Sequence, residues 1–299
     1  MRVLITGAQG QVGQELMHLA PASWQVHGLG SKELDISNAQ QVMTVVQTLQ
    51  PQLIINAAAY TAVDKAESDS MRAHAVNHLG AENLAKAAQQ QNCPLLHIST
   101  DYVFSGQQTQ PYTEQDTPAP NSVYGASKWL GEQAINACCA QHIILRTSWV
   151  FGLHGNNFVK TMLRLAQGRD ALNIVSDQVG GPTSARSIAQ ALWQIAQQYQ
   201  SSGSCAWGTY HFSGAPTCSW YDFAIEIFKQ AVALKLIAHS PRLKPINSSA
   251  YPTLATRSTY SVLDNSKIQQ HFNIPQSDWK AELSLILAAL KDAQTCTLR

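Results

Sequence analysis

The amino-acid sequence predicts an α/β fold with a doubly wound parallel sheet and a smaller, partly discontinuous C-terminal lobe. The first observation is that short apolar runs alternate with segments of helical periodicity through the first half of the chain. The second is a glycine-rich turn that directly follows the first apolar run and opens the first helix. Together they indicate a sheet of the Rossmann type.

Strands and helices alternate in order through this first half. Short, strongly apolar runs are typical of buried strands, and the segments between them repeat apolar residues at helical spacing. A capping box at residues 37–40 opens the second helix, and Pro51 ends it. The expected strands are residues 3–5, 25–27, 53–55, 95–99 and 143–147. The expected helices begin near Gln11, follow residues 37–40, cover about 68–91 and span 127–138.

After Trp149 the alternation loosens, which indicates a second, smaller lobe. We expect a first domain over residues 1–150, to which a helix over 184–200 returns, and a second lobe formed mainly by residues 151–299. Within the second half, we expect a strand at 172–175 and helices at 158–167, through 188–199, from 219–222 onward and from about Asp278.

Composition excludes several classes of protein. The chain carries 20 Lys and Arg residues against 19 Asp and Glu residues, without the basic surface of a nucleic-acid-binding protein. Its apolar stretches are far shorter than the ~20 residues of a membrane span, and no secretion signal precedes the glycine turn. The six cysteines form no Cys-x-x-Cys pair, so neither zinc nor a disulfide framework is expected. We expect a cytoplasmic protein with no nucleic-acid or membrane partner.

The glycine-rich turn points to a nucleotide. Gly7, Gly10 and Gly13 allow a tight turn and a close approach of the backbone to a pyrophosphate. Gln11 and Val12 lie at the start of the helix, where N–H groups and the helix dipole favour an anion. Three loop glycines can also occur by chance, but the strand-turn-helix context favours binding. The first domain is therefore predicted to bind a dinucleotide, and the second lobe to bind a substrate.

The end of the second strand bears on the choice of cofactor. Residues 26–32 lack the acidic side chain that usually holds the ribose 2′-hydroxyl of NAD. Ser31 with Lys32 can meet a 2′-phosphate instead, although Lys32 is equally well interpreted as a solvated lysine. We expect NADPH or NADH, with NADPH bound at least as well. Asp35 and Ile36 suit the adenine side. Three small residues after the third strand can lie against the cofactor: Ala57, Ala58 and Ala59.

A tyrosine and a lysine lie four residues apart at the start of a predicted helix, so Tyr124 and Lys128 share one face. A nearby cation favours the ionised form of a phenol, and such a pair can shuttle a proton. Thr100 follows the fourth strand at the edge where open α/β sheets bind ligands. Each feature alone is common on helix surfaces or in turns, but their order after the glycine turn favours catalysis.

Six segments resemble the dTDP-4-dehydrorhamnose reductases, a branch of the extended short-chain dehydrogenase/reductases. The resemblance runs from Met1 to about Trp279. The resemblance implies reduction of the 4-keto group of dTDP-4-dehydro-L-rhamnose to dTDP-L-rhamnose by NADPH or NADH. This reaction is the last step in the synthesis of that nucleotide sugar, which is expected to be used for lipopolysaccharide synthesis. The segments are residues 7–13, 56–64, 99–104, 124–128, 146–150 and 177–183.

The resemblance also implies residue roles. Tyr124 would be the general acid that protonates the developing alkoxide. Lys128 would lower the pKa of Tyr124 and bind the nicotinamide ribose. Thr100 would hydrogen-bond the keto oxygen, Asp101 would contact the sugar, and Trp149 would pack in the sugar pocket.

Two departures from the family pattern concern a metal and a phosphate ligand. Family members can form a homodimer bridged by Mg²⁺ on acidic side chains; Glu15 fits the first such place, but Arg186 stands where a second acid is expected. The sequence therefore predicts no metal, with Glu15 as the candidate ligand, and leaves Mg²⁺ and the homodimer open. Arg257 suits a sugar-nucleotide phosphate, but Ser258 follows it in place of the usual proline.

Two rival functions remain at this point. A dehydratase or epimerase of the same fold is one, but dehydratases carry an Asp-Glu pair after the threonine, whereas Asp101 is followed by Tyr102. The other is a non-catalytic regulatory subunit that binds a dinucleotide. The presence of Thr100, Tyr124 and Lys128 favours an enzyme.

Overall fold

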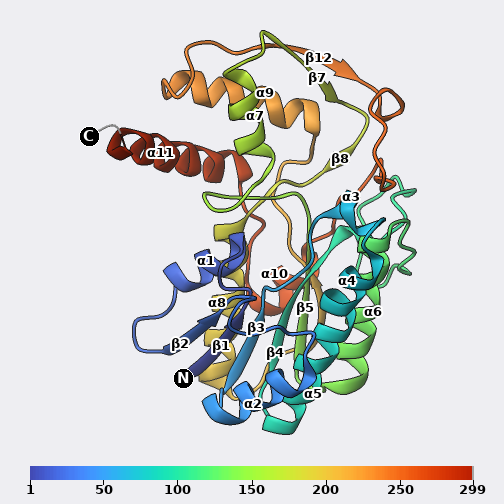
Figure 1. Cartoon of the computed structure of the whole chain (residues 1–299), viewed down its shortest axis with the longest axis vertical. Helices are drawn as coiled ribbons and strands as arrows, with labels where there is room; N and C mark the ends of the chain where they lie inside the picture. The colour runs from blue at the N-terminus through green and yellow to red at the C-terminus, as the bar shows by residue number, and fades with distance from the viewer. Residues whose placement is uncertain (298–299) are drawn as a thin grey trace.

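The computed structural model describes residues 1–297. At its centre is a six-stranded sheet in the order β10-β5-β4-β3-β1-β2, in which all neighbouring strands run parallel (Figure 1). This confirms the predicted α/β fold with a doubly wound sheet. The strands are β1 (Arg2–Thr6), β2 (Gln25–Leu29), β3 (Leu53–Asn56), β4 (Leu95–Thr100), β5 (His142–Thr147) and β10 (Gly208–His211).

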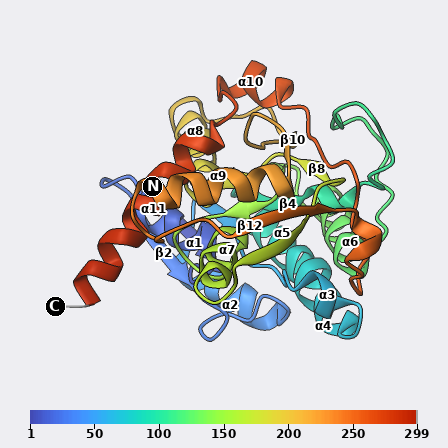
Figure 2. The same ribbon diagram turned by 90° about the horizontal axis from the view of Figure 1, so that it is seen from above.

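Helices cover both faces of the sheet, so alternate residues of a strand belong to different cores. Val3 and Ile5 of β1 pack with α1, α8 and α10, whereas Leu4 points to the opposite face and packs with α2, α5 and α6. Figure 2 shows α8 and α10 on one side of the molecule and α2 on the other. The bounds are α1 (Gln11–His18), α8 (Ala185–Ser202), α10 (Ser266–Phe272), α2 (Ala39–Leu49), α5 (Gly80–Gln91) and α6 (Val123–Cys138).

The chain returns to the sheet after residue 150. Helix α8 lies on the same face as α1, and the Trp193 indole donates a hydrogen bond to the Leu16 carbonyl at 3.1 Å. Strand β10 pairs with β5, which the sequence analysis did not anticipate because this short Gly-Thr-Tyr-His run has no apolar periodicity. The division of the chain into domains at residue 150 stays a prediction.

The long helix expected over residues 68–91 contains a π-helical turn. It consists of α4 (Ser70–His74), the π turn η1 (Ala75–Leu79) and α5. Asn77 in the π turn is buried and bridges two segments. Its Oδ1 accepts from the Tyr60 N–H, and its Nδ2 donates to the Tyr60 carbonyl and, at 3.0 Å, to the Ser127 hydroxyl. Such turns often occur at functional sites, and this one faces the loop after β3.

Helix caps correct one detail of the sequence analysis. Asn38, and not Ser37, caps α2: its side chain accepts from the Gln41 N–H at 3.0 Å. The Ser37 hydroxyl instead donates a hydrogen bond to Asp35 at 2.6 Å. Helix α6 begins before the expected residue 127, because the Ser122 hydroxyl caps it.

A second group of helices packs beyond one end of the sheet, around a separate apolar core (Figure 1). A capping box of Ser219 and Asp222 opens α9, as predicted. The helices are α7 (Phe158–Ala166), α9 (Trp220–Ala233) and α11 (Trp279–Thr297). Three pairs of short strands accompany them. They are β7 (Ala171–Val175) with β12 (Arg242–Ile246), β6 (Val150–Phe151) with β9 (Thr183–Ser184), and β8 (Val179–Gly180) with β11 (Cys218–Ser219). Short helices are α3 (Val63–Ala66), η2 (Asp101–Val103) and η3 (Ser248–Ala250).

None of the helices within residues 1–297 has the length and apolar character needed to cross a membrane.

Candidate active site

The glycine turn forms a tightly packed cradle between β1 and α1. Gly7 has a φ of +70°, and a Cβ there would lie 2.5 Å from the Ala58 nitrogen. A Cβ at Gly13 would overlap the Gly7 carbonyl oxygen. Gly10, which has no side chain to act as a cap, is the N-cap residue of α1. The backbone N–H groups at the start of α1 therefore fit a pyrophosphate.

Gln11 and Val12 contribute through their backbone. The Gln11 side chain accepts a hydrogen bond from Asn157 at 2.9 Å, and the Val12 side chain packs in the core beneath the sheet. Their side chains are therefore engaged inside the protein, while their N–H groups lie in the first turn of α1.

A cavity of about 300 Å³ opens beside the glycine turn. It brings together predicted cofactor residues from three strand ends: Gly7, Gly10, Asp35, Ile36, Ala57, Ala58 and Ala59. Ser31 also lines the cavity, whereas Lys32 is exposed on the surface. Arg72 and Val76, which the sequence analysis missed, line the opposite wall. Their spacing of four residues places both on one face of a helix, but only the fold shows that this face meets the cavity.

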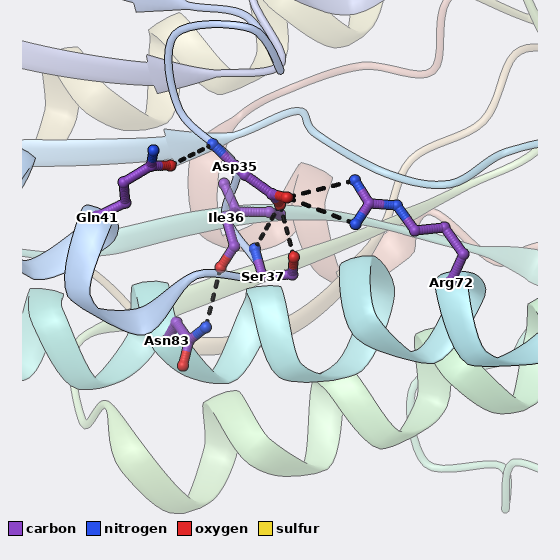
Figure 3. Close-up of polar contacts among 6 residues, drawn as sticks. All are labelled: Asp35, Ile36, Ser37, Gln41, Arg72 and Asn83. Atoms are coloured by element: carbon purple, nitrogen blue, oxygen red, sulfur yellow. Dashed lines mark hydrogen bonds and ion pairs between the residues drawn. The ribbon is translucent and has the colours of Figure 1, made fainter.

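Asp35 is held by a network of polar contacts at the rim of this cavity (Figure 3). Its Oδ1 accepts from the Ser37 hydroxyl at 2.6 Å and the Ser37 N–H at 3.0 Å, and Arg72 lies 3.5 Å from Oδ2. The Ser37 hydroxyl, followed by Arg72, lowers the pKa of Asp35. The Asn83 amide donates to the Ile36 carbonyl at 2.9 Å. Asp35 is thus an ionised, oriented acceptor next to a guanidinium.

Thr100, Asp101 and Tyr124 meet at the carboxyl end of β4. Burial raises the pKa of Tyr124, and a hydrogen bond with Thr100 offsets part of that rise. The Thr100 hydroxyl also donates to Asp101 Oδ1 at 3.0 Å. Burial raises the pKa of Asp101 to about 6. Because burial raises its pKa, the Tyr124 phenol keeps its proton at neutral pH, which suits a proton donor.

Lys128 differs from the sequence expectation. Its Nζ donates to the Ile98 carbonyl at 2.6 Å and lies 3.0 Å from His97 Nε2. Burial lowers the pKa of Lys128 to about 8. The sequence predicts that Lys128 lowers the pKa of Tyr124, but in the structure burial raises that pKa. Lys128 is instead engaged with the backbone and side chains of β4.

Trp149 adopts a conformation that side chains rarely take. Its φ is +47°, and its ring stacks on Trp220 with centroids 3.6 Å apart. Gly180 lies against the same ring, because a Cβ there would be 2.6 Å from Trp149 Cε2. Backbone strain of this kind often accompanies a functional position. The stacked pair extends from the end of β5 to the start of α9.

Arg257 contacts the short helix α3 through Asp64. Its Nη2 lies 2.7 Å from Asp64 Oδ2, and the guanidinium also lies close to Tyr102. Burial raises the pKa of Tyr102 to about 12, and Arg257 opposes that rise. The ring of Tyr102 packs edge-on against Tyr124 at 5.4 Å. Arg257 thus reaches the neighbourhood of Tyr124 from a distant part of the chain.

Glu15 is buried, and its Oε1 is 3.9 Å from His154 Nε2. Within residues 1–297 of one chain, no three or more His, Cys, Asp or Glu side chains gather in a way that could hold a metal ion. Mg²⁺ therefore has no support within one chain, and a homodimer bridged by it stays a prediction.

A buried ion pair connects β5 to α6. Arg146 on β5 makes contacts of 2.6 to 3.1 Å with the Glu132 carboxylate on α6. The Ser99 hydroxyl on β4 donates to the same carboxylate at 2.5 Å. The three residues join β5 to β4, which carries Thr100, and to α6, which carries Tyr124 and Lys128.

Comparisons with known proteins agree with this geometry. Residues 1–292 match the family described as RmlD substrate binding domain. The chain is 48% identical to a dTDP-4-dehydrorhamnose reductase of Aggregatibacter actinomycetemcomitans, over 96% of this chain and 98% of that one. It is 40% identical to the protein of the same name from Escherichia coli K12, over 97% and 98%.

Solved structures of such enzymes share the fold. A dTDP-4-dehydrorhamnose reductase of Bacillus anthracis in complex with NADP matches with a TM-score of 0.88 and 37% identity, over 95% of this chain and 98% of that one. A UDP-glucose 4-epimerase of Thermus thermophilus, at 20% identity and a TM-score of 0.79 over 96% and 98%, shares the fold alone. The chain therefore belongs to the RmlD substrate binding domain family, the family of the dTDP-4-dehydrorhamnose reductases.

Proposed function

We propose that the protein reduces dTDP-4-dehydro-L-rhamnose to dTDP-L-rhamnose with NADPH or NADH. The observation that carries the proposal is the meeting of Thr100, Tyr124 and Lys128 at β4, one strand away from the glycine-turn cavity. Relatives named dTDP-4-dehydrorhamnose reductase, which align along nearly the whole chain, support the choice of substrate.

The residues around the cavity fit a dinucleotide. The glycine cradle suits the pyrophosphate, and Asp35 and Ile36 suit the adenine side. Lys128 does not line this cavity, and its assignment to the nicotinamide ribose rests on the family resemblance. The relative from Bacillus anthracis contains NADP, which supports this assignment. When bound, the reduced nicotinamide supplies a hydride to C4 of the sugar.

The protein's own residues then handle the oxygen and its proton. The Thr100 hydroxyl donates a hydrogen bond to the keto oxygen and orients the carbonyl beside Tyr124. The Tyr124 phenol, kept protonated by burial, gives its proton to the developing alkoxide. Asp101 contacts a sugar hydroxyl, and Trp149 packs against the sugar ring. No step requires a metal at Glu15.

The assay that tests this proposal follows NADPH absorbance with dTDP-4-dehydrorhamnose as the substrate. Substrate-dependent oxidation of NADPH supports the reductase. Dinucleotide binding without turnover of dTDP- or GDP-4-keto sugars would favour the regulatory subunit instead. A homodimer, a cytoplasmic location and a role in lipopolysaccharide synthesis stay predictions; light scattering in solution tests the first.

We expect the protein to bind NADPH at least as tightly as NADH. Residues 26–32 contain no carboxylate, and Ser31 and Arg72 both line the cavity. The carboxylates that follow are engaged, Glu33 by the Gly30 N–H and Asp35 by Ser37 and Arg72. Arg72→Ala should weaken NADPH binding more than NADH binding, since the variant removes a guanidinium that can pair with a phosphate. Intrinsic fluorescence titration measures both affinities. Arg242→Ala, at an exposed arginine of β12, serves as the control, and a tenfold preference for NADH, roughly 1.4 kcal/mol, would contradict the expectation.

Arg257→Ala is expected to raise KM for the sugar nucleotide with little change in NADPH affinity. A guanidinium can pair with a diphosphate through two charge-assisted hydrogen bonds, and its removal weakens ground-state binding. Steady-state kinetics and NADPH titration separate the two effects. Arg242→Ala, at an exposed arginine of β12, is the control. An unchanged KM would show that Arg257 serves only its ion pair with Asp64.

A further inference from the structure

Two tryptophans from distant parts of the chain form a parallel stack beyond the end of the sheet. The rings of Trp149 and Trp220, the first residue of α9, have centroids 3.6 Å apart and planes inclined by 7°. Two aromatic residues of the apolar core beyond the sheet, Phe158 and Phe223, lie against Trp220, with ring centroids at 4.7 and 6.3 Å. Because the two indoles are parallel and in contact, Trp220 covers one face of Trp149.

Gly180 of β8 makes a second close contact with the same indole. A Cβ at this position would lie 2.6 Å from Trp149 Cε2 and 2.8 Å from Nε1, so any side chain there would displace the ring. Strand β8 pairs with β11, which ends at Ser219, directly before Trp220. Both contacts with Trp149 therefore come from one small sheet, and its hydrogen bonds fix their spacing.

The backbone of Trp149 is held in a conformation that a bulky residue rarely adopts. Its φ of +47° lies in the left-handed region. The Thr183 N–H donates to the Trp149 carbonyl at 3.3 Å, and the neighbouring Ser148 hydroxyl donates to the Gly181 carbonyl at 2.7 Å. Such strain persists only where the surroundings over-determine the conformation. Here the ring contacts and the backbone contacts do so together.

The stack borders the residues that the proposed function assigns to the sugar. Trp149 lies two residues beyond β5, whose last residue pairs in register with Thr100 at the end of β4. The Cβ position of Gly180 is also 2.8 Å from the Ser261 hydroxyl, and Ser261 forms a hydrogen bond with Asp101. Trp149 is only half-buried, so part of its indole is left for a ligand.

We propose that Trp220 and Gly180 are positioning residues that fix which part of the Trp149 indole meets the sugar. This inference rests on the proposed function, in which Trp149 packs against the sugar ring. Packing of this kind is sensitive to position, because a gap of about 0.5–1 Å already removes a quarter to a half of the dispersion attraction. An indole that is free to move therefore binds the sugar weakly, while the contacts to the nucleotide remain.

Calorimetric titration with two ligands isolates the contribution of the sugar. The ligand dTDP contains the nucleotide alone and dTDP-L-rhamnose adds the sugar, so the ratio of their affinities measures what the sugar contributes. We expect Trp220→Ala to lower this ratio by about tenfold, because Trp149 loses the ring that supports it. The affinity for dTDP should stay nearly unchanged. Trp220→Phe, which keeps an aromatic ring against Trp149, should recover most of the loss.

Gly180→Ala tests the second contact, since its methyl group would overlap the Trp149 indole. We expect the same selective loss of the sugar contribution. Gly168→Ala is the matched control, because a Cβ there meets nothing within 4 Å. Trp24→Ala is the control for the tryptophan variant, since Trp24 packs edge-on against Trp193 in the core on one face of the sheet. Both controls should leave the ratio of the two affinities unchanged.

Fluorine NMR of protein labelled with 5-fluorotryptophan reports on Trp149 without any ligand. The chain has seven tryptophans, and Trp149→Phe identifies the Trp149 signal. We expect one narrow Trp149 signal in the wild type and in Trp220→Phe, and a broadened or split signal in Trp220→Ala, because the unsupported ring samples several positions.

A narrow Trp149 signal in Trp220→Ala, or an equal loss of affinity for dTDP and dTDP-L-rhamnose in that variant, would overturn the inference. Equal binding of the two ligands by the wild type would instead contradict the proposed function. The NMR spectra separate these two failures, because they report whether Trp220 holds the Trp149 ring in the absence of any substrate.

Discussion

Tyr124→Phe is expected to lower kcat by roughly 10²–10⁴-fold while the fold and the NADPH affinity stay nearly unchanged. The phenylalanine ring still fills the buried site beside Tyr102, but no proton is available for the alkoxide. Because burial raises the pKa of Tyr124, the phenol is the protonated form over the whole neutral range, and the loss should not depend on pH there.

Stopped-flow or steady-state assays of NADPH oxidation measure this loss, and fluorescence titration checks cofactor binding. Tyr112→Phe is the matched control, since Tyr112 is also buried but its ring stacks on Phe104. Its kcat should stay within a few-fold of wild type. Full activity of Tyr124→Phe would show that another group supplies the proton.

Glu132→Ala is expected to destabilise the protein by about 3–5 kcal/mol, because it leaves the Arg146 guanidinium buried without its carboxylate. Both side chains are almost completely buried, and the pair joins β5 to α6. The same change leaves the Ser99 hydroxyl without its acceptor. Since the free energy of unfolding of a typical domain is only about 5–15 kcal/mol, such a loss is a large fraction of the total.

Chemical denaturation measured by circular dichroism gives the free energy of unfolding. Glu82→Ala is the control, because Glu82 pairs with Lys86 on the exposed surface of α5, where an ion pair contributes about 0–1 kcal/mol. Glu132→Gln should lose less than Glu132→Ala, as the amide oxygen can still accept from Arg146. Equal stability of Glu132→Ala and wild type would refute the structural role of the pair.

The sequence by itself determined five of the six strands of the sheet, β1 to β5, and the glycine turn. Local patterns were sufficient there, because each strand is a short apolar run and the turn needs glycines at fixed positions. The short distance from Tyr124 to Lys128 along one helix likewise placed both on one face. The cap of α2, however, is Asn38 and not Ser37, whose hydroxyl donates to Asp35 in the structure.

Only the tertiary structure decided which distant residues meet. Strand β10 completes the sheet without any apolar repeat, because β5 supplies its hydrogen bonds. Arg72 reaches Asp35, and Arg257 reaches Asp64, through contacts that no local spacing encodes. The pKa of Lys128 depends on its surroundings in the same way: burial lowers it to about 8, because the protein interior penalises the charged form.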